Sequence, residues 1–242
     1  MNLAIIIGVS NYTHVSPLPG CAADVQHMRD LLVATGKYSS IVCINHHTQQ
    51  RHIKSRLDKI VADHKSKPID ELFVYFSGHG VFDEQALLCC SDYHPQRARE
   101  TSIENDYLDE VIRLLNPQLA VKVIDACQSG EPYIKGPNEA FKQALHKRPL
   151  GAFICMASSR HDQVSMATAQ GSIFTQCWID AALCRSRGVI RYTDIQRYLA
   201  LSFVNDLRQQ PYFVSQGSAL EAFAEVTLEM NLLFKARRKQ LE

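Results

Sequence analysis

The feature that most constrains the fold is a regular alternation of short apolar runs and longer amphipathic segments. The first apolar run, residues 3–9, is typical of a strand that is buried on both faces. The next segment, residues 21–35, has apolar residues at helical spacing and is followed by Gly36, which favours helix termination. Strands and helices that alternate in this way form a mainly parallel sheet covered by helices on both faces. We therefore expect an α/β fold, a three-layer α/β/α sandwich whose central sheet has about six strands.

The alternation continues through most of the chain. Residues 131–149 contain three prolines and four basic residues, which favours a surface connection with a candidate helix at 139–146. Residues from 219 onward are expected to form a terminal helix with a basic end. Further strands are expected at 41–45, 71–77, 86–90, 119–125, 151–157 and 212–214, and further helices at 49–64, 103–115, 173–185 and 193–207.

Composition limits the classes of partner. The chain has 242 residues, 46% of them hydrophobic, and no linker-like stretch, so one domain with a sizeable core is expected. The net charge is only +1 with both signs interspersed, which gives no support for nucleic acid as a partner. No apolar run approaches the ~18 residues of a membrane span, and the first residues lead directly into a strand rather than a leader peptide. We expect a cytoplasmic protein with no membrane partner.

The cysteines do not indicate a metal site or a disulfide framework. Their spacing lacks the paired C-x-x-C units of zinc sites, and several stand inside apolar runs, where cysteine behaves as a small buried apolar residue. Reduced thiols are therefore expected. The eight residues are Cys21, Cys43, Cys89, Cys90, Cys127, Cys155, Cys177 and Cys184.

Two turns carry the candidate chemistry. The strand at 71–77 leads into Gly78-His79-Gly80, and the strand at 119–125 leads into Cys127. If the two strands lie close together, an imidazole within reach of the thiol can take its proton and generate a nucleophile for attack on a carbonyl. The N–H groups of Gly78 and Cys127 are the expected donors to the oxyanion. The sequence thus predicts a Cys-His dyad of a cysteine peptidase.

Each turn by itself has a plainer interpretation. A cysteine at the end of a buried strand is more often a packing residue, and a histidine between glycines is often only a turn residue. A metal held by His79 and Cys127 has too few obvious further ligands to be favoured. The two turns together, each directly after a strand, are what favours the catalytic interpretation.

The chain resembles caspase-like cysteine peptidases of the C14 type, specifically the metacaspase and bacterial caspase-homologue branch. His79 precedes Cys127 by about fifty residues, as in caspases. The resemblance runs from about residue 3 to residue 215, nearly the whole chain, and implies a caspase-like fold. The motifs that carry it are Ile6-Ile7-Gly8-Val9-Ser10-Asn11-Tyr12, Leu18-Pro19-Gly20-Cys21-Ala22-Ala23-Asp24, Ser77-Gly78-His79-Gly80, Asp125-Ala126-Cys127-Gln128-Ser129-Gly130, Ala157-Ser158-Ser159 and Gly171-Ser172-Ile173-Phe174-Thr175.

The resemblance also implies a specificity. In the metacaspase branch a pocket for the residue before the scissile bond is lined by groups that match Cys21, Asp24, Ser77 and Asp125. Two carboxylates would repel an acidic side chain and bind a guanidinium by paired hydrogen bonds, so cleavage after Arg, and also Lys, is expected. Asp24 has a plainer interpretation as an acidic residue near a helix N-terminus.

The resemblance further divides the chain. It implies a peptidase domain at 1–218, with a large-subunit-like part at 1–130, a connecting segment at 131–149 and a small-subunit-like part at 150–218, followed by a helical tail at 219–242. Many relatives are cut in the connecting segment, although a solvated loop is the plainer interpretation. Its basic residues, the candidate self-cleavage sites, are Lys135, Lys142, Lys147 and Arg148.

Many metacaspases require calcium, for which Asp92, Glu104 and Asp106 are the candidate ligands here. An acid expected after Cys127 is missing and Asn105 replaces another, so we expect no required metal or other cofactor. The implied partners are a protein substrate and a separate activator or sensor, in bacterial cell death or antiviral defence. A catalytically silent caspase-like scaffold is the main alternative; a flavodoxin-like binding domain explains the alternation but neither turn.

Overall fold

The computed structural model describes the chain except residues 128–150, 160–166, 169–170, 207 and 242. Its centre is a six-stranded sheet with the strand order β12-β8-β7-β3-β1-β2. All neighbouring pairs are parallel except β12 with β8. The strands are β1 (Asn2–Gly8), β2 (Ser40–Ile44), β3 (Glu71–Ser77), β7 (Leu119–Asp125), β8 (Ala152–Ala157) and β12 (Tyr212–Gln216).

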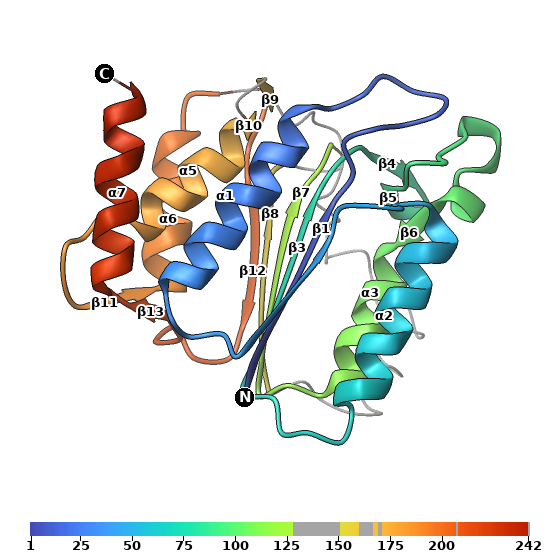
Figure 1. The fold of residues 1–242 in the computed structure, drawn as a ribbon. Coiled ribbons are helices and arrows are strands. Elements are labelled where there is room, and N and C mark those ends of the chain that lie inside the picture. The colour runs from blue at the N-terminus through green and yellow to red at the C-terminus, as the bar shows by residue number, and fades with distance from the viewer. Residues whose placement is uncertain (128–150, 160–166, 169–170, 207, 242) are drawn as a thin grey trace.

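Helices cover both faces of this sheet (Figure 1). One face carries α1 (Gly20–Ala34), α5 (Ile173–Ala182), α6 (Tyr192–Ser202) and α7 (Leu228–Leu241), and the other carries α2 (Gln50–His64) and α3 (Asn105–Leu115). The side chains of each strand alternate between the two cores. In β3, Phe73 and Tyr75 belong to the first core, and Leu72, Val74 and Phe76 to the second. The predicted three-layer α/β/α fold is confirmed.

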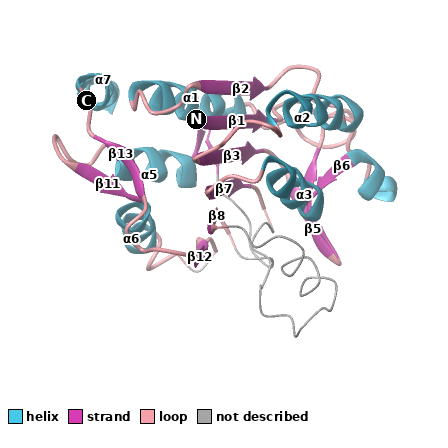
Figure 2. Cartoon of the chain, turned by 90° about the horizontal axis from the view of Figure 1, so that it is seen from below, coloured by secondary structure: helices cyan, strands magenta, loops and turns pink. Residues whose placement is uncertain are grey.

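Smaller sheets lie around the central one. A three-stranded antiparallel sheet, beside α2 and α3 in Figure 2, follows directly after β3. It consists of β4 (Gly80–Asp83), β5 (Gln85–Cys89) and β6 (Ser102–Glu104), with short 3-10 helices at Pro95–Arg97 and Arg99–Thr101 before β6. Two further antiparallel pairs are β9 (Ala167–Thr168) with β10 (Gly171–Ser172), and β11 (Val189–Arg191) with β13 (Ala222–Glu225).

The main disagreement with the predicted elements concerns the chain after residue 219. These residues do not form one helical tail, because β13 pairs with β11 before α7 begins. Phe223 of β13 and Met230 of α7 are almost fully buried in the first core, so this segment is part of the domain. The helix expected from 103 starts at Asn105 instead, since residues 102–104 pair with β5.

The other predicted strands and helices that fall on described residues are present, with most ends shifted by one or two residues. The helices expected at 173–185 and 193–207 end earlier, at Ala182 and Ser202, and the candidate helix at 139–146 lies outside the described residues. None of the helices in the described part of the chain combines the length and apolar character that crossing a membrane requires.

Candidate active site

The two candidate turns lie side by side at the carboxyl edge of the sheet. β3 and β7 are neighbours in a register that pairs Ser77 with Asp125, the last residue of each strand. The N–H of Gly78 donates to the Asp125 carbonyl oxygen at 3.2 Å. A Cβ atom added to Gly80 would collide with the Cys127 carbonyl oxygen, so only glycine allows this approach of the two chains. The fold therefore brings the turn with His79 next to half-buried Cys127.

The imidazole of His79 is held by two residues to which the sequence analysis gave no role. Nε2 lies 2.9 Å from the Ser16 carbonyl oxygen. Since a carbonyl can only accept, Nε2 carries the proton, and Nδ1 of the neutral ring is left as the base. Tyr12 accepts the His79 backbone N–H at 2.7 Å, and its ring centroid lies 4.7 Å from the imidazole centroid. Tyr12 belongs to the first motif of the resemblance, but no sequence signal pointed to Ser16.

The structure argues against Gly78 as an oxyanion donor, since its N–H is engaged with Asp125. Gly80 is better placed. The N–H of Cys89 donates to the His79 carbonyl oxygen at 2.9 Å, one position before Gly80 and Leu88 begin the β4–β5 ladder, so the His79 carbonyl faces β5. The next pair along an antiparallel ladder directs its N–H groups away from the partner strand. The N–H of Gly80 therefore points away from β5. Gly80 is also the residue whose backbone lies against that of Cys127.

Hydrogen bonds from residues that follow the neighbouring strand β8 hold the backbone of the Cys127 turn in place. The carbonyl oxygen of Ala126 accepts hydrogen bonds from the hydroxyls of Ser158 at 3.1 Å and Ser159 at 3.3 Å, the two residues that follow β8. The Ser158 N–H also donates to the Ile124 carbonyl oxygen at 2.9 Å. These bonds fix the backbone immediately before the thiol.

Four polar residues that the sequence analysis assigned to a basic-selective pocket also meet at this edge. Asp24 and Asp125 are only 1% and 3% exposed, and the Ser77 hydroxyl donates to Asp24 Oδ2 at 3.0 Å. Cys21 is buried beside them on the same helix as Asp24, and burial raises the pKa of its thiol to about 12. The structure thus brings Cys21, Asp24, Ser77 and Asp125 together.

The two carboxyl groups influence each other strongly. Burial, together with the negative charge of Asp125, raises the pKa of Asp24 to about 7, although hydrogen bonds from Ser172 and Ser77 oppose the shift. Like charges in a buried site disfavour ionisation of both groups. A cation placed between them would reverse that effect, so the pair is suited to a positively charged ligand.

Two further residues contact the acidic pair and were not singled out as pocket residues. The Ser172 N–H donates to Asp24 Oδ1 at 2.9 Å, and the Ser172 hydroxyl donates to Asp125. The Thr175 hydroxyl donates to Asp125 Oδ2 at 2.5 Å. Both residues stand in the last motif of the resemblance, but no sequence pattern indicated that the start of α5 would face β7.

Two of the three candidate calcium ligands, Asp92 and Glu104, accept hydrogen bonds from neighbouring residues. Asp92 accepts the Gln50 N–H at 3.0 Å at the start of α2, and the Gln85 amide donates to Glu104 at 3.4 Å. Asn105 accepts from the buried Lys122 ammonium at 2.8 Å. Among the described residues no group of three or more His, Cys, Asp and Glu side chains is arranged to hold a metal ion. The candidate self-cleavage residues lie outside the described residues.

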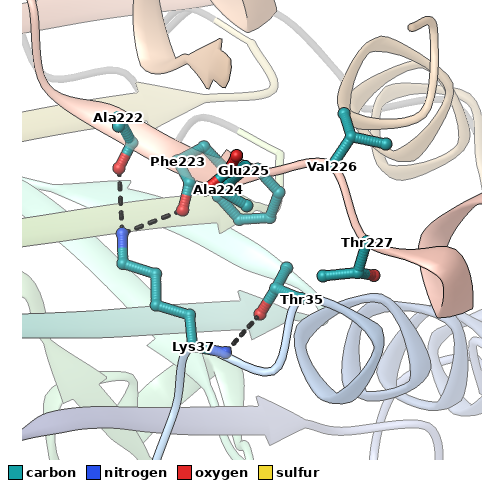
Figure 3. A pocket seen from close by; sticks show the side chains of 8 residues that line it. All are labelled: Thr35, Lys37, Ala222, Phe223, Ala224, Glu225, Val226 and Thr227. Atoms are coloured by element: carbon teal, nitrogen blue, oxygen red, sulfur yellow. Dashed lines mark hydrogen bonds between the residues drawn. The ribbon is translucent and has the colours of Figure 1, made fainter. Parts of the chain in front are cut away.

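Two open cavities lie at the other end of the sheet. One has a volume of about 410 Å³ and is lined by Thr35, Lys37 and residues 222–227 (Figure 3). The other, of about 520 Å³, is lined by residues at the amino ends of the strands, including Asn2 and Glu71. Neither is lined by the residues at the carboxyl edge.

Comparisons with known proteins show which family the chain belongs to. The sequence profile of the caspase domain, peptidase family C14, matches residues 1–240. The chain belongs to the caspase domain family. Metacaspase-1 of Plasmodium falciparum is 30% identical over 146 residues, which cover 52% of this chain and 24% of that protein. The chain therefore matches only about a quarter of the length of this relative.

Solved structures show the same fold at low identity. A Geobacter sulfurreducens protein superposes with a TM-score of 0.67 at 15% identity, covering 93% of this chain and 99% of that one. Caspase-1 of Spodoptera frugiperda gives a TM-score of 0.65 at 18% identity, covering 94% of this chain and 91% of its own. The likeness to the caspase-1 structure, together with the family match, confirms the caspase-like fold expected from the motifs.

Proposed function

We propose that this caspase-family chain is a cysteine endopeptidase that cleaves proteins after Arg or Lys, with Cys127 as nucleophile and His79 as base. The single observation that carries the specificity is the buried carboxyl pair of Asp24 and Asp125, at the same edge of the sheet as the two catalytic turns. A substrate guanidinium or ammonium at this pair would present the following carbonyl to Cys127.

The proposed reaction starts from the neutral His79 ring and the Cys127 thiol. Nδ1 of His79 takes the Cys127 proton, and the thiolate attacks the scissile carbonyl carbon. We assign the oxyanion to the N–H groups of Cys127 and Gly80, in place of the Gly78 donor expected from sequence. His79 then protonates the leaving amine, and water hydrolyses the thioester. The Ser16 carbonyl stabilises the imidazolium through Nε2.

A panel of matched fluorogenic peptides with Arg, Lys, norleucine or Asp before the scissile bond tests this function. We expect turnover of the Arg and Lys peptides, negligible turnover of the others, and no turnover by Cys127→Ala. Preferential cleavage after Asp would refute the specificity. If no condition or added activator gives turnover or labelling of Cys127, the chain acts as a silent scaffold instead.

We further propose self-processing between the two subunit-like parts. Lys135, Lys142, Lys147 and Arg148 each fit the proposed specificity. Intact mass spectrometry of the wild type against Cys127→Ala is the measurement, and cleavage after one of these residues only in the wild type is the expected result. Intact chains in both proteins, under conditions where the wild type cleaves peptides, would contradict it.

The remaining proposals concern regulation. We propose a cytoplasmic enzyme that needs no metal or nucleic acid and is controlled by a separate activator or sensor protein, in bacterial cell death or antiviral defence. The family resemblance supports this setting by analogy alone. The metal proposal is the easiest to test: turnover of the Arg peptide should be the same within twofold in EDTA and in millimolar calcium. A tenfold calcium stimulation would contradict it.

A further inference from the structure

The first turn of α5 contacts both carboxyl groups of the acidic pair. Ser172 is the N-cap of this helix, and its hydroxyl oxygen accepts the Thr175 N–H at 3.0 Å. The same residue donates its N–H to Asp24 at 2.9 Å and its hydroxyl to Asp125. One residue thus bridges two carboxyl groups that come from different elements, α1 and β7.

Thr175 adds a second fixed donor. Its side chain is fully buried, and its hydroxyl donates to Asp125 Oδ2 at 2.5 Å. Because the Thr175 proton is used there, the Tyr75 hydroxyl, 2.6 Å from Thr175 Oγ1, must be the donor of that contact. The result is a chain of hydrogen bonds from Tyr75 through Thr175 to Asp125, in which each bond strengthens the next.

This arrangement fixes the direction in which Asp125 presents its carboxylate. A guanidinium is planar and bonds well only to acceptors in the correct plane and spacing, whereas an ammonium is a compact charge that tolerates misplacement. Orientation of the carboxylate therefore matters more for arginine than for lysine. The positive end of the α5 dipole stabilises the charged form of the carboxyl groups, and this effect does not distinguish arginine from lysine.

We propose that Ser172 and Thr175 are positioning residues that set the preference for arginine over lysine in the substrate pocket. The inference rests on the proposed function and adds to it the residues that decide between its two substrates. A purely structural role for the two hydroxyls would change stability and the amount of active enzyme, but it would leave the ratio of the two substrates unchanged.

Thr175→Val is the decisive variant, because it removes the hydroxyl and nearly keeps the shape. The readouts are kcat/KM for matched Arg and Lys peptides and the inhibition constants of the matching argininal and lysinal peptides. We expect the Arg/Lys ratio to fall about tenfold, the size of effect expected for one lost hydrogen bond to a charged group, mainly through the Arg substrate. Thr193→Val is the matched control, in the first turn of α6 with its hydroxyl on the Ala219 carbonyl, and it should leave the ratio unchanged.

Tyr75→Phe provides a second route if Thr175→Val does not fold. It removes the donor to Thr175 without touching the carboxylates, and the Arg/Lys ratio should fall about two- to threefold, as for a lost neutral hydrogen bond. An unchanged ratio in an active Thr175→Val or, failing that, Tyr75→Phe protein overturns this inference alone. Wild-type protein that cleaves neither substrate overturns the proposed function, and this inference with it.

Discussion

Glu71 begins β3 and Asp125 ends β7, so buried carboxyl groups stand at opposite ends of the same sheet. At the amino end, Glu71 accepts the Lys37 ammonium at 2.5 Å and the hydroxyls of Tyr38 and Tyr192 at 2.5 and 2.7 Å. Lys37 also donates to the carbonyl oxygens of Ala222 and Phe223 (Figure 3). The Lys37 charge neutralises that of Glu71, and the hydrogen bonds of this cluster connect β13 and α6 to the sheet.

The carboxyl end is built differently. Asp24 and Asp125 lie beside each other and accept from neutral hydroxyl and N–H groups, and their mutual repulsion raises the pKa of Asp24. A buried carboxylate with its own cation contributes to structure, whereas the mutual repulsion of a buried like-charged pair is relieved when a cation binds. We infer that the first site stabilises the fold, and that repulsion between the two carboxyl groups of the second favours a cationic ligand.

The largest expected effect is on activity at the carboxyl end. Asp125→Asn removes one charge that faces the substrate cation and should lower kcat/KM for the Arg peptide by about 100- to 1,000-fold, the range for breaking a buried charge pair. The melting temperature should stay the same or rise, because the repulsion is relieved. Alkylation of Cys127 by iodoacetamide is the control and should proceed as in the wild type.

The opposite pattern is expected at the amino end. Lys37→Met leaves the buried Glu71 charge without its cation and should lower the free energy of unfolding by about 3 kcal/mol, as for other broken buried pairs. Urea unfolding measures this, and kcat/KM per folded molecule should change less than twofold. Loss of activity in fully folded Lys37→Met, or loss of stability in Asp125→Asn, would abolish the distinction between the two ends.

The pH dependence sharpens the comparison. With an Asp24 pKa of about 7, the empty pocket holds a proton at pH 6 and releases it by pH 8, so KM for the Arg peptide should fall about tenfold over this range. Because the folded-state pKa lies above the unfolded value, this carboxyl binds more protons in the folded state. Its contribution to stability therefore decreases as pH rises from about 4 to 7. A KM that is flat from pH 6 to 8 would show that the pair is not titrating where the substrate binds.

The smallest effect concerns the support of the imidazole. Tyr12→Phe removes the acceptor of the His79 N–H and keeps the ring contact, so kcat should fall about fivefold, as for one neutral hydrogen bond. KM for the Arg peptide should not change, because Tyr12 contacts His79 rather than the acidic pair. A change confined to KM would instead place Tyr12 in substrate binding.

Much of this site could be predicted from local patterns. The apolar runs that end at Ser77 and Asp125 fix both strand ends, and parallel pairing then brings the following turns together. The contacts of Ser172 and Thr175 with Asp125 could not be predicted from the sequence, because they depend on how α5 packs against β7, some fifty residues earlier in the chain. The choice of Gly80 over Gly78 depends on the β4–β5 register, and the burial of Phe223 depends on pairing with distant β11.

The most direct test of the central claim is covalent labelling of Cys127 by matched peptide chloromethylketones that carry arginine, norleucine or aspartate. Peptide mapping identifies the modified cysteine, and the rate of modification measures how well the pocket accepts each side chain. We predict rapid labelling of Cys127 by the arginyl reagent alone, and loss of that advantage over the norleucyl reagent in Asp125→Asn. Equal or faster labelling by the aspartyl reagent, or an arginyl advantage that survives in Asp125→Asn, would contradict a cation-binding role of the acidic pair.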